Sequence, residues 1–437
     1  MTRIARVRGR RVWDSRARPT VEAEVVLDNG MVGRAIAPAG ASMGSGEAVD
    51  LRDGGTALGG RDVRRAVEHV ETEIAAALQG MDIAEQPAID RSLVDLDGTP
   101  QKARLGGNAT IAVSMAALHA AAAAAGVPLY AHLAQGRPMR IPVPEIQILG
   151  GGAHAGRRVD IQDFMVMCPS AASFAEALDR TAEVYHAAGR LLREAGRAGG
   201  VADEGGWWPA FGSNEEALDL LLRAIEAAGY TPGQDVHIAL DIAASDFGKD
   251  GRYRLSLEGR ELDRDGMAEL LLSWLARYPI LSIEDPFGED DAEGFRRFTA
   301  AVGDRVQVVG DDLLVTDAGR VAEAASRRLA TCALIKPNQA GTVTETLAAL
   351  EAARAAGLTT IVSARSGETE DTTIADLAVG WDAGQIKVGS IARGERTAKW
   401  NALLRIEEVL AGRAAFAGWD ALPMRTAVKT PALRAWT

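Results

Sequence analysis

The chain contains little cysteine, and it has no long apolar run. Its 437 residues include only two cysteines, Cys168 and Cys332, which are too few to cross-link a secreted protein of this size. We therefore expect two free thiols and a reducing, cytoplasmic environment. No stretch approaches the roughly 20 apolar residues of a membrane span, since the longest run, at 116–125, is interrupted by His119. The Arg-rich start lacks the apolar segment of a signal peptide, and we expect it to form a strand.

Positive charge is also in deficit. Lys and Arg total 48 against 60 Asp and Glu, which gives a formal net charge of −12. This field would repel a phosphate backbone, so we expect no nucleic-acid partner. A small anionic substrate is compatible with the sequence if local cations or metal ions override the global charge.

What the chain does have is a composition and length typical of two globular domains, with 47% hydrophobic residues. Residues 1–137 predict an α+β domain with strands at 20–27 and 32–37, a Gly-rich loop at 37–46, and helices near 61–78 and 108–125. The alanine-rich end of the last helix is expected to pack closely against a sheet. From residue 138 to 437 the pattern changes to short apolar runs separated by long amphipathic helices.

Eight apolar runs in the second part predict an α/β barrel. The last five begin 26 or 27 residues apart, which suits one strand, one helix and two loops. The first two runs are too close together for a full helix between them, and two long helices, near 173–198 and 214–228, follow. The expected order is therefore ββαα followed by six βα units, closing a parallel, TIM-like barrel. The runs lie at 141–149, 163–168, 236–243, 279–284, 306–310, 332–336, 359–363 and 385–389.

Acidic residues end three consecutive runs. Asp241, Glu284 and Asp311 would meet at the C-terminal mouth of such a barrel, where barrels of this kind place their chemistry. Three carboxylates within a few ångströms need a cation, and oxygen ligands favour Mg²⁺, with Mn²⁺ as the substitute. For any one acid alone, capping the next helix or pairing with a surface arginine is an equally good interpretation.

Cationic residues lie at the ends of the last three runs. Lys336 and Lys387, desolvated beside a metal, would have depressed pKa values, so that a neutral amine could act as a base. Arg365 offers a planar fork for a phosphate or carboxylate, and Ser366 adds a hydroxyl. For Lys387 alone, a salt-bridge network with the acids is nearly as good an interpretation. Together, the metal, base and anion fork favour removal of a proton next to a carboxylate.

The sequence resembles the enolase family, and the resemblance covers essentially the whole chain. So many motifs in the same order make the signal specific. The matching segments are WDSRARPTVEAEV, PAGASMGSGEAVDLRDG, GGAHAGRRVDIQDFM, ADEGG, SNEEALDLL, ALDIAASDF, SIEDP, VGDDLLVT, LIKPNQAGTVTETL, SGETEDTTIADLAV and RIEE.

The resemblance implies a small α+β domain that caps a ββαα(βα)6 barrel, two Mg²⁺ ions per site and an oligomer, commonly a dimer or octamer. It also implies a role for each matching residue. Asp241, Glu284 and Asp311 match the ligands of one Mg²⁺ and Ser42 a ligand of the second; Lys336 matches the base, Glu204 the acid that helps the hydroxyl leave, Arg365 and Ser366 the phosphate site and Lys387 the carboxylate site, while His154, Gln162 and Asp163 fall at active-site loop positions.

Several positions depart from the family pattern, and they cluster around the site. Ala364 stands where enolases typically have histidine, and Asp163 where glutamate is usual. Trp207 and Trp208 replace the usual Phe-Ala and could build a new wall or stacking surface. Gly150, Ala39 and Pro337 are further replacements. The half of the site that handles metal, base and anion is intact, whereas the half that handles the leaving hydroxyl is altered.

We interpret this division as selection for different chemistry on a similar substrate. The expected substrate is a phosphorylated three-carbon acid, 2-phosphoglycerate or phosphoenolpyruvate. One enolase-like class that fits is carboxyphosphonoenolpyruvate synthase of phosphonate antibiotic biosynthesis, whose second substrate is a nucleotide-activated phosphonoformate. The alternatives are an ordinary phosphopyruvate hydratase, or a non-catalytic scaffold built on a retired enolase fold.

Overall fold

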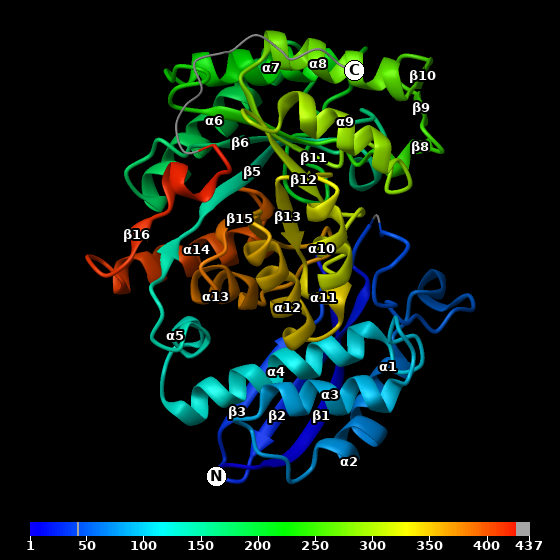
Figure 1. Cartoon of the computed structure of the whole chain (residues 1–437), viewed down its shortest axis with the longest axis vertical. Helices are drawn as coiled ribbons and strands as arrows, with labels where there is room; N and C mark the ends of the chain where they lie inside the picture. Colours follow the sequence, from blue (N-terminus) through cyan, green and yellow to red (C-terminus); the bar gives the residue numbers. More distant parts are fainter. Residues whose placement is uncertain (42, 425–437) are drawn as a thin grey trace.

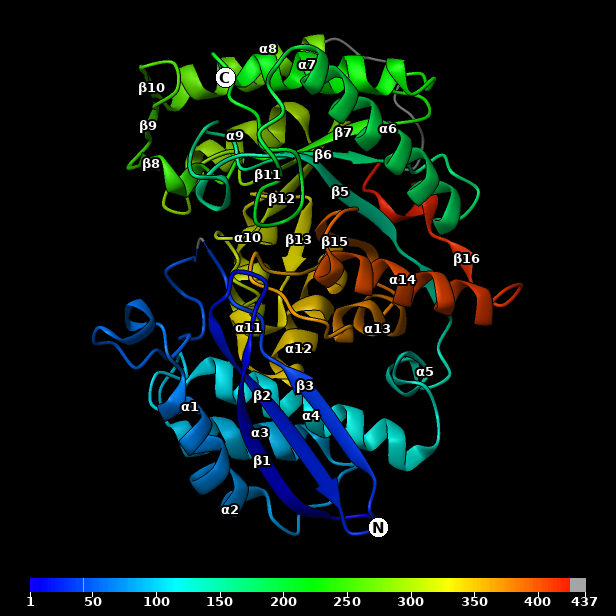
Figure 2. The same ribbon diagram turned by 180° about the vertical axis from the view of Figure 1, so that it is seen from behind.

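The structure is a computed structural model that describes residues 1–41 and 43–424. Its N-terminal part is an antiparallel sheet in the order β1-β2-β3, formed by β1 (Ile4–Trp13), β2 (Pro19–Leu27) and β3 (Val32–Ile36). The Arg-rich start is thus a strand, as predicted. The sheet and its helices lie on one side of the barrel (Figures 1 and 2).

The alanine-rich helix α4 (Gly107–Ala125) covers one face of this sheet. The approach is close, because a Cβ added at Gly33 of β3 would lie 2.1 Å from the carbonyl oxygen of Ala116. Only small side chains on the helix permit such contact, which confirms the predicted packing. Contrary to the expectation that no stretch approaches a membrane span, this helix is long and apolar enough to cross a membrane; 78% of its most apolar window is, however, buried inside the protein, as in a core helix.

Short helices complete the N-terminal part and lead to the barrel. The predicted helix at 61–78 is a succession of α1, a π-helical segment η2 and α2. The bounds are η1 (Ala57–Gly60), α1 (Arg64–His69), η2 (Val70–Ile74), α2 (Ala75–Leu78), α3 (Gln86–Asp97) and α5 (Leu129–Ala134).

Eight strands close the barrel, and each corresponds to one predicted apolar run. Their order around the barrel is β11-β12-β13-β14-β15-β5-β6-β7. The bounds are β5 (Val143–Gly150), β6 (Asp163–Met167), β7 (His237–Asp241), β11 (Ile280–Glu284), β12 (Gln307–Gly310), β13 (Cys332–Ile335), β14 (Thr359–Ser363) and β15 (Gly384–Ser390).

The prediction of a fully parallel barrel is wrong for one strand. β6 runs antiparallel to both β5 and β7. The segment between β5 and β6 holds no more than the short η3 (Ala153–Ala155), and a parallel crossover requires a longer connection, usually a helix. The reversal places Asp163, the first residue of β6, directly opposite Asp241, the last residue of β7.

Helices surround the barrel, and several begin at hydroxyl or carboxylate caps. Ser173 and Ser213 cap the two long helices by accepting the amide N–H of Glu176 and Glu216. The helices are α6 (Phe174–Glu194), α7 (Asn214–Ala227), α8 (Arg264–Arg277), α9 (Ala292–Val302), α10 (Ala318–Ser326), α11 (Pro337–Ala340), α12 (Val343–Ala355), α13 (Thr373–Gly380) and α14 (Gly394–Val409).

Two small sheets were not predicted. One is a three-stranded insertion after β7, and the other pairs β4 with β16, near the end of the described chain. Their strands are β8 (Gly248–Lys249), β9 (Arg252–Leu255), β10 (Arg260–Asp263), β4 (Arg140–Ile141) and β16 (Ala415–Phe416), with the short helices η4 (Ala244–Asp246) and η5 (Gly418–Ala421).

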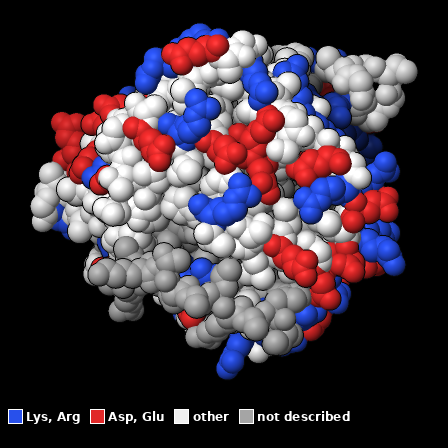
Figure 3. All heavy atoms as spheres, turned by 90° about the horizontal axis from the view of Figure 1, so that it is seen from above, with Lys and Arg blue, Asp and Glu red and all other residues white. Residues whose placement is uncertain are grey.

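The Gly-rich loop after β3 reaches over the C-terminal ends of β13 and β14. Ala39 and Gly367 exchange two backbone hydrogen bonds of 2.9 Å, and the amide of Ala48 donates to the carbonyl of Gln339 at 2.8 Å. The N-terminal part therefore covers one side of the barrel mouth. On the face shown in Figure 3, basic and acidic side chains are interspersed.

Candidate active site

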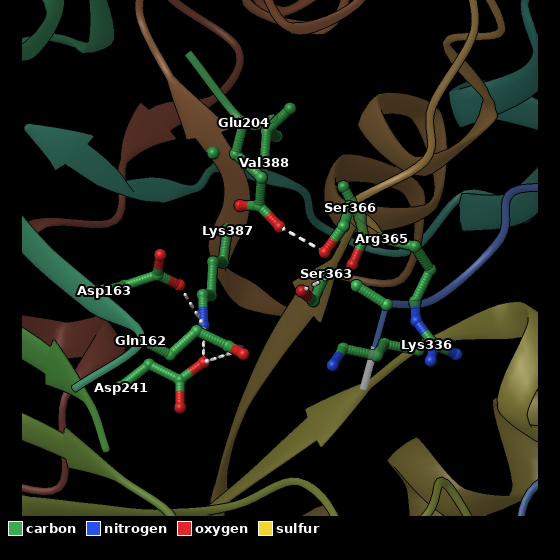
Figure 4. Close-up of a pocket in the computed structure, with 13 residues that line it drawn as sticks. Gln162, Asp163, Glu204, Asp241, Lys336, Ser363, Arg365, Ser366, Lys387 and Val388 are labelled. Atoms are coloured by element: carbon green, nitrogen blue, oxygen red, sulfur yellow. Dashed lines mark hydrogen bonds and ion pairs between the residues drawn. The ribbon is translucent and has the colours of Figure 1, made fainter. Parts of the chain in front are cut away.

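A narrow pocket lies at the C-terminal mouth of the barrel, where the charged strand ends converge (Figure 4). Most of the candidate residues that were identified from the sequence line it. The lining residues are Ala41, Gln162, Asp163, Glu204, Asp241, Lys336, Ser363, Ala364, Arg365, Ser366, Lys387, Val388 and Gly389.

Lys387, on β15, is held by three carboxylates. Its Nζ lies 2.7 Å from Asp241 Oδ2, 2.8 Å from Glu284 Oε2 and 3.3 Å from Asp163 Oδ2. Gln162 also donates to Asp241 Oδ2, at 3.0 Å. The salt-bridge network that the sequence left open for Lys387 is therefore present in the structure.

Lys336 reaches the pocket from another side (Figure 4). It follows β13 directly, and its Nζ lies 2.5 Å from Asp311 Oδ2. The other oxygen of Asp311 accepts a hydrogen bond of 2.8 Å from Gln339. Pro337, at the first position of α11, starts a helix immediately after the lysine, so the backbone on both sides of Lys336 is restrained.

The three acids proposed as metal ligands do not form a tight triad with these side-chain positions, contrary to expectation. Among the described residues, the triads whose ligand atoms lie within 4.8 Å of one another are His154–Asp163–Glu204 and Asp285–Asp311–Asp312. The reason is electrostatic, because each lysine draws acids toward itself. Asp241 and Glu284 turn to Lys387, and Asp311 turns to Lys336.

The donor set nevertheless fits a divalent cation. Glu284 is buried, and its Oε1 has no hydrogen-bond partner among the described residues. Burial raises the pKa of Glu284 well above its ordinary value, and the neighbouring Asp241 and Asp311 raise it further. A hard cation bound by the three oxygens would relieve this repulsion. The helix-cap interpretation is wrong for these acids, since Asp263, Asp291 and Asp317 are the aspartates that cap neighbouring helices.

The expected depression of the lysine pKa values is not present in this arrangement. Burial lowers the pKa of Lys336, but the carboxylates of Asp311 and Glu284 together outweigh it and the net pKa is raised. For Lys387, Asp241, Glu284 and Asp163 outweigh burial in the same way, and its pKa is raised well above the ordinary value. A neutral Lys336 therefore requires that Asp311 be engaged by another cation.

His154 is buried between two candidate residues. Its side chain has 0% exposure, with Nε2 3.2 Å from Asp163 Oδ1 and Nδ1 3.5 Å from Glu204 Oε1. Burial lowers its pKa, but Glu204 and Asp163 outweigh burial and raise it to about 9. For Asp163, burial would raise the pKa, yet Lys387 and His154 hold it below the ordinary range. The imidazole is therefore enclosed between the two carboxylates and does not face solvent.

Arg365 and Ser366, the residues that the resemblance assigns to a phosphate site, follow β14 and line one side of the pocket. Ser366 donates to Glu204 Oε1 at 2.8 Å, and Arg365 forms an ion pair of 2.7 Å with Glu47 of the N-terminal part. Arg396, fully buried on α14, donates to the backbone carbonyls of Arg365, Ser366 and Val388. The donors that this side of the pocket could offer to a phosphate or carboxylate are the guanidinium of Arg365 and the hydroxyl of Ser366.

The residues that depart from the family pattern occupy different places. Ala364 lines the pocket between Ser363 and Arg365, whereas Trp207 and Trp208 do not line it, contrary to the expected new wall. Trp207 stacks on Tyr185, with 5.0 Å between ring centroids, and its indole N–H donates to the Tyr185 carbonyl. A Cβ added at Gly150 would lie only 2.7 Å from that of Ala202, so a larger residue would require a shift.

Some residues of the site were missed from the sequence, and one predicted residue lies outside the structure's description. Glu47, Gln147 and Gln339 contact Arg365, Asp163 and Asp311 respectively. Gln147 is a polar residue in the apolar run 141–149, and its position two residues after Glu145 is the signal that both face the barrel interior. Ser42 lies outside the described residues.

These observations define the class of protein: an α/β barrel whose mouth gathers acids that could hold a divalent cation, two lysines and an arginine. Comparison with family models agrees. Residues 4–133 match the enolase N-terminal domain, and residues 138–424 match the enolase C-terminal TIM barrel domain. The chain belongs to the enolase family, whose members are in general Mg²⁺-dependent lyases.

Proposed function

We propose that this protein binds 2-phosphoglycerate or phosphoenolpyruvate with Mg²⁺ and forms a metal-stabilised enolate at its barrel mouth. The observation that carries the proposal is the position of Lys336, whose amine lies against Asp311 beside a pocket with Arg365 and Lys387 on its walls. One group removes a proton, while the others hold the two anionic ends of a small acid.

Each residue has a defined task in this proposal. Arg365 and Ser366 bind the phosphate and Lys387 the carboxylate, while Asp241, Glu284 and Asp311 would hold one Mg²⁺. Bound Mg²⁺ supplies positive charge that lowers the energy of the dianionic enolate. Lys336 Nζ accepts the proton from the carbon next to the carboxylate, and Glu204, from another side of the pocket, protonates the departing group.

We further propose that the reaction is specialised, most simply that of a carboxyphosphonoenolpyruvate synthase. Ala364 supports this proposal, since a methyl group lines the pocket where the family has an imidazole, which leaves room beside Arg365. The ordinary hydratase is the second candidate, and the contact between Glu204 and Ser366 favours it because the acid that would release water is present. A scaffold role is disfavoured by the intact charged residues of the mouth.

The experiment follows the proton and the product separately. The full-length protein is incubated with Mg²⁺ and 2-phosphoglycerate in D2O; loss of the C2 proton signal by NMR reports enolate formation, and absorbance at about 240 nm reports phosphoenolpyruvate. Proton exchange with little enol absorbance, and nucleotide release on adding nucleotide-activated phosphonoformate, would support the specialised enzyme. Rapid enol formation would support the hydratase.

The Lys336→Met variant tests the assignment of the base. General-base catalysis typically contributes about 10²–10⁴-fold, so C2 exchange should fall by roughly that factor while Mg²⁺-dependent substrate binding persists in calorimetry. Lys249→Met, an exposed lysine on β8, is the control and should exchange normally. Undiminished exchange in Lys336→Met would refute the assignment, and absence of any Mg²⁺-dependent binding by the wild type would favour the scaffold.

A further inference from the structure

Two loops, rather than strand ends, hold Glu204, which lines the pocket, and His154, whose imidazole lies directly behind it. His154 lies in the loop 151–162 between β5 and β6, and Glu204 lies in the loop 195–213 between α6 and α7. Their backbones meet, since the amide of Asp203 donates to the carbonyl of His154 at 3.3 Å. The distance between the two side chains therefore depends on how firmly one loop is fixed to the other.

In loop 195–213, Trp208 is the residue whose side chain contacts loop 151–162. Its half-buried indole N–H donates to the carbonyl of Ala155, the residue after His154. The indole also packs against Gly156, where an added Cβ would lie 3.2 Å from Cζ2 of Trp208 and where φ is +63°. A glycine at 156 thus satisfies both the left-handed backbone and the close approach of the ring.

Arg158, also in loop 151–162, packs its guanidinium group over the indole ring of Trp208. Its guanidinium carbon lies 3.9 Å from the Trp208 ring centroid, closer than the five other cation–π contacts of the described chain, which range from 5.1 to 5.9 Å. One of its terminal nitrogens donates to the Trp208 carbonyl at 3.3 Å. The neighbouring Arg157 points elsewhere, toward Asp246.

We propose that Arg158 and Trp208 form a latch that fixes loop 151–162 to loop 195–213 and so holds His154 beside Glu204. Both are positioning residues, because neither lines the pocket. The latch is suited to this task, since it engages the first loop on both sides of residue 156. Its consequence for catalysis rests on the function proposed above for Glu204.

Hydrogen exchange tests the latch without reference to activity. In the full-length protein, Trp208→Phe and Arg158→Gln should accelerate exchange of the amides in 153–160 and of Asp203 by at least fivefold, while amides of the barrel strands stay unchanged. Arg158→Lys, which keeps the charge, should restore part of the protection. Arg157→Gln is the matched control and should stay within twofold of the wild type. Unchanged exchange in both latch variants, or equal effects of the two arginine changes, would overturn the proposal.

Kinetics provides the second measurement. Loosening the latch should lower kcat for the step that uses Glu204 by about tenfold, with KM changed less than twofold. The C2 deuterium exchange by Lys336 should stay within twofold, because Lys336 reaches the pocket from β13. A general loss of structure would lower both rates and is thereby excluded. If the wild type shows no C2 exchange, the proposed function fails but the hydrogen-exchange test stands; if it exchanges C2 normally and the variants keep their loop protection, the latch fails alone.

Discussion

At the scale of single residues, the chemistry of the mouth follows from the contacts of two lysines with four carboxylates. Lys387 contacts Asp163, Asp241 and Glu284, and Lys336 contacts Asp311. The negative charge of Glu284 is strongly disfavoured, because the side chain is fully buried and the carboxylates of Asp241 and Asp311 lie nearby. Lys387 relieves part of the repulsion by contacting Asp241 and Glu284 at once. Oε1 of Glu284 has no hydrogen-bond partner in the described part of the chain, and a divalent cation would bind it.

Replacement of Glu284 by Gln should weaken Mg²⁺ binding. The change keeps the shape but removes one of the three carboxylates, and we expect the dissociation constant to rise by at least about tenfold, which is the lower end of the effect of changing a residue that merely supports a metal ligand. Calorimetric titration with Mg²⁺ in the presence of substrate measures it. Glu261→Gln, an exposed acid on β10, is the control, and equal affinities in the two variants would contradict the assignment.

Replacement of Glu145 by Gln should make the protein's stability less dependent on pH. Glu145 is fully buried in the barrel, where burial raises its pKa from 4.5 to about 7. An acid with a raised folded-state pKa contributes no penalty below about pH 4.5, and its penalty grows until the pH passes about 7.

The variant should therefore gain stability at pH 8, on the order of 3 kcal/mol at most for a shift of this size, and little at pH 5. Urea unfolding at the two pH values measures the difference. An equal gain at both values would show that packing, rather than ionisation, distinguishes the two side chains.

At the scale of elements, the ends of strands and the start of one helix set the positions of the charged groups. The C-terminal ends of β7, β11, β12, β13 and β14 could be located from the sequence, because a charged residue ends each run or follows it within two residues; β15 continues three residues past Lys387, to Ser390. The start of α14 could not be assigned a role in this way. Arg396 and Lys399 are three residues apart on this helix and both fully buried, and they bind the segment 365–369.

Arg396→Lys should weaken substrate binding more than it weakens the fold. Lysine keeps the charge but cannot reach the three carbonyls that the guanidinium joins, so the ends of β14 and β15 lose their common anchor. We expect about a tenfold loss in affinity for 2-phosphoglycerate with Mg²⁺, equivalent to about 1.4 kcal/mol, measured by calorimetry. Arg405→Lys, an exposed arginine on the same helix, should bind normally; a similar loss there would contradict the proposed role.

At the scale of the whole molecule, the pocket is completed by contact between the two parts of the chain. The N-terminal part contributes Glu47, which forms an ion pair with Arg365 in which both side chains are almost fully buried. The sequence separation of this pair is 318 residues. Arg365, to which we assign the phosphate, is thus oriented by a residue that is remote in the chain.

Glu47→Gln should destabilise the protein substantially. Removing one partner of a buried pair leaves the other charge uncompensated, and the typical cost is about 3–5 kcal/mol. Glu73→Gln is a matched control, since Glu73 pairs with Arg104 at 2.9 Å but both side chains are more than 40% exposed; its cost should be about 0–1 kcal/mol. Chemical denaturation compares the two, and equal losses would mean that the Glu47 pair is not a buried contact in solution.

The sequence by itself determined the number and order of the barrel strands and the charged residues at or near the C-terminal ends of the last six, because apolar runs and their spacing depend on local composition. Tertiary structure alone decided the pairing of each lysine with its acids and the contacts of Glu47, Gln147 and Trp208. These features join residues that are distant in the chain, and their geometry depends on burial and on competition between charges. Neither quantity is encoded in the spacing of a motif, so the acids that a sequence pattern places together can still be drawn apart by neighbouring cations.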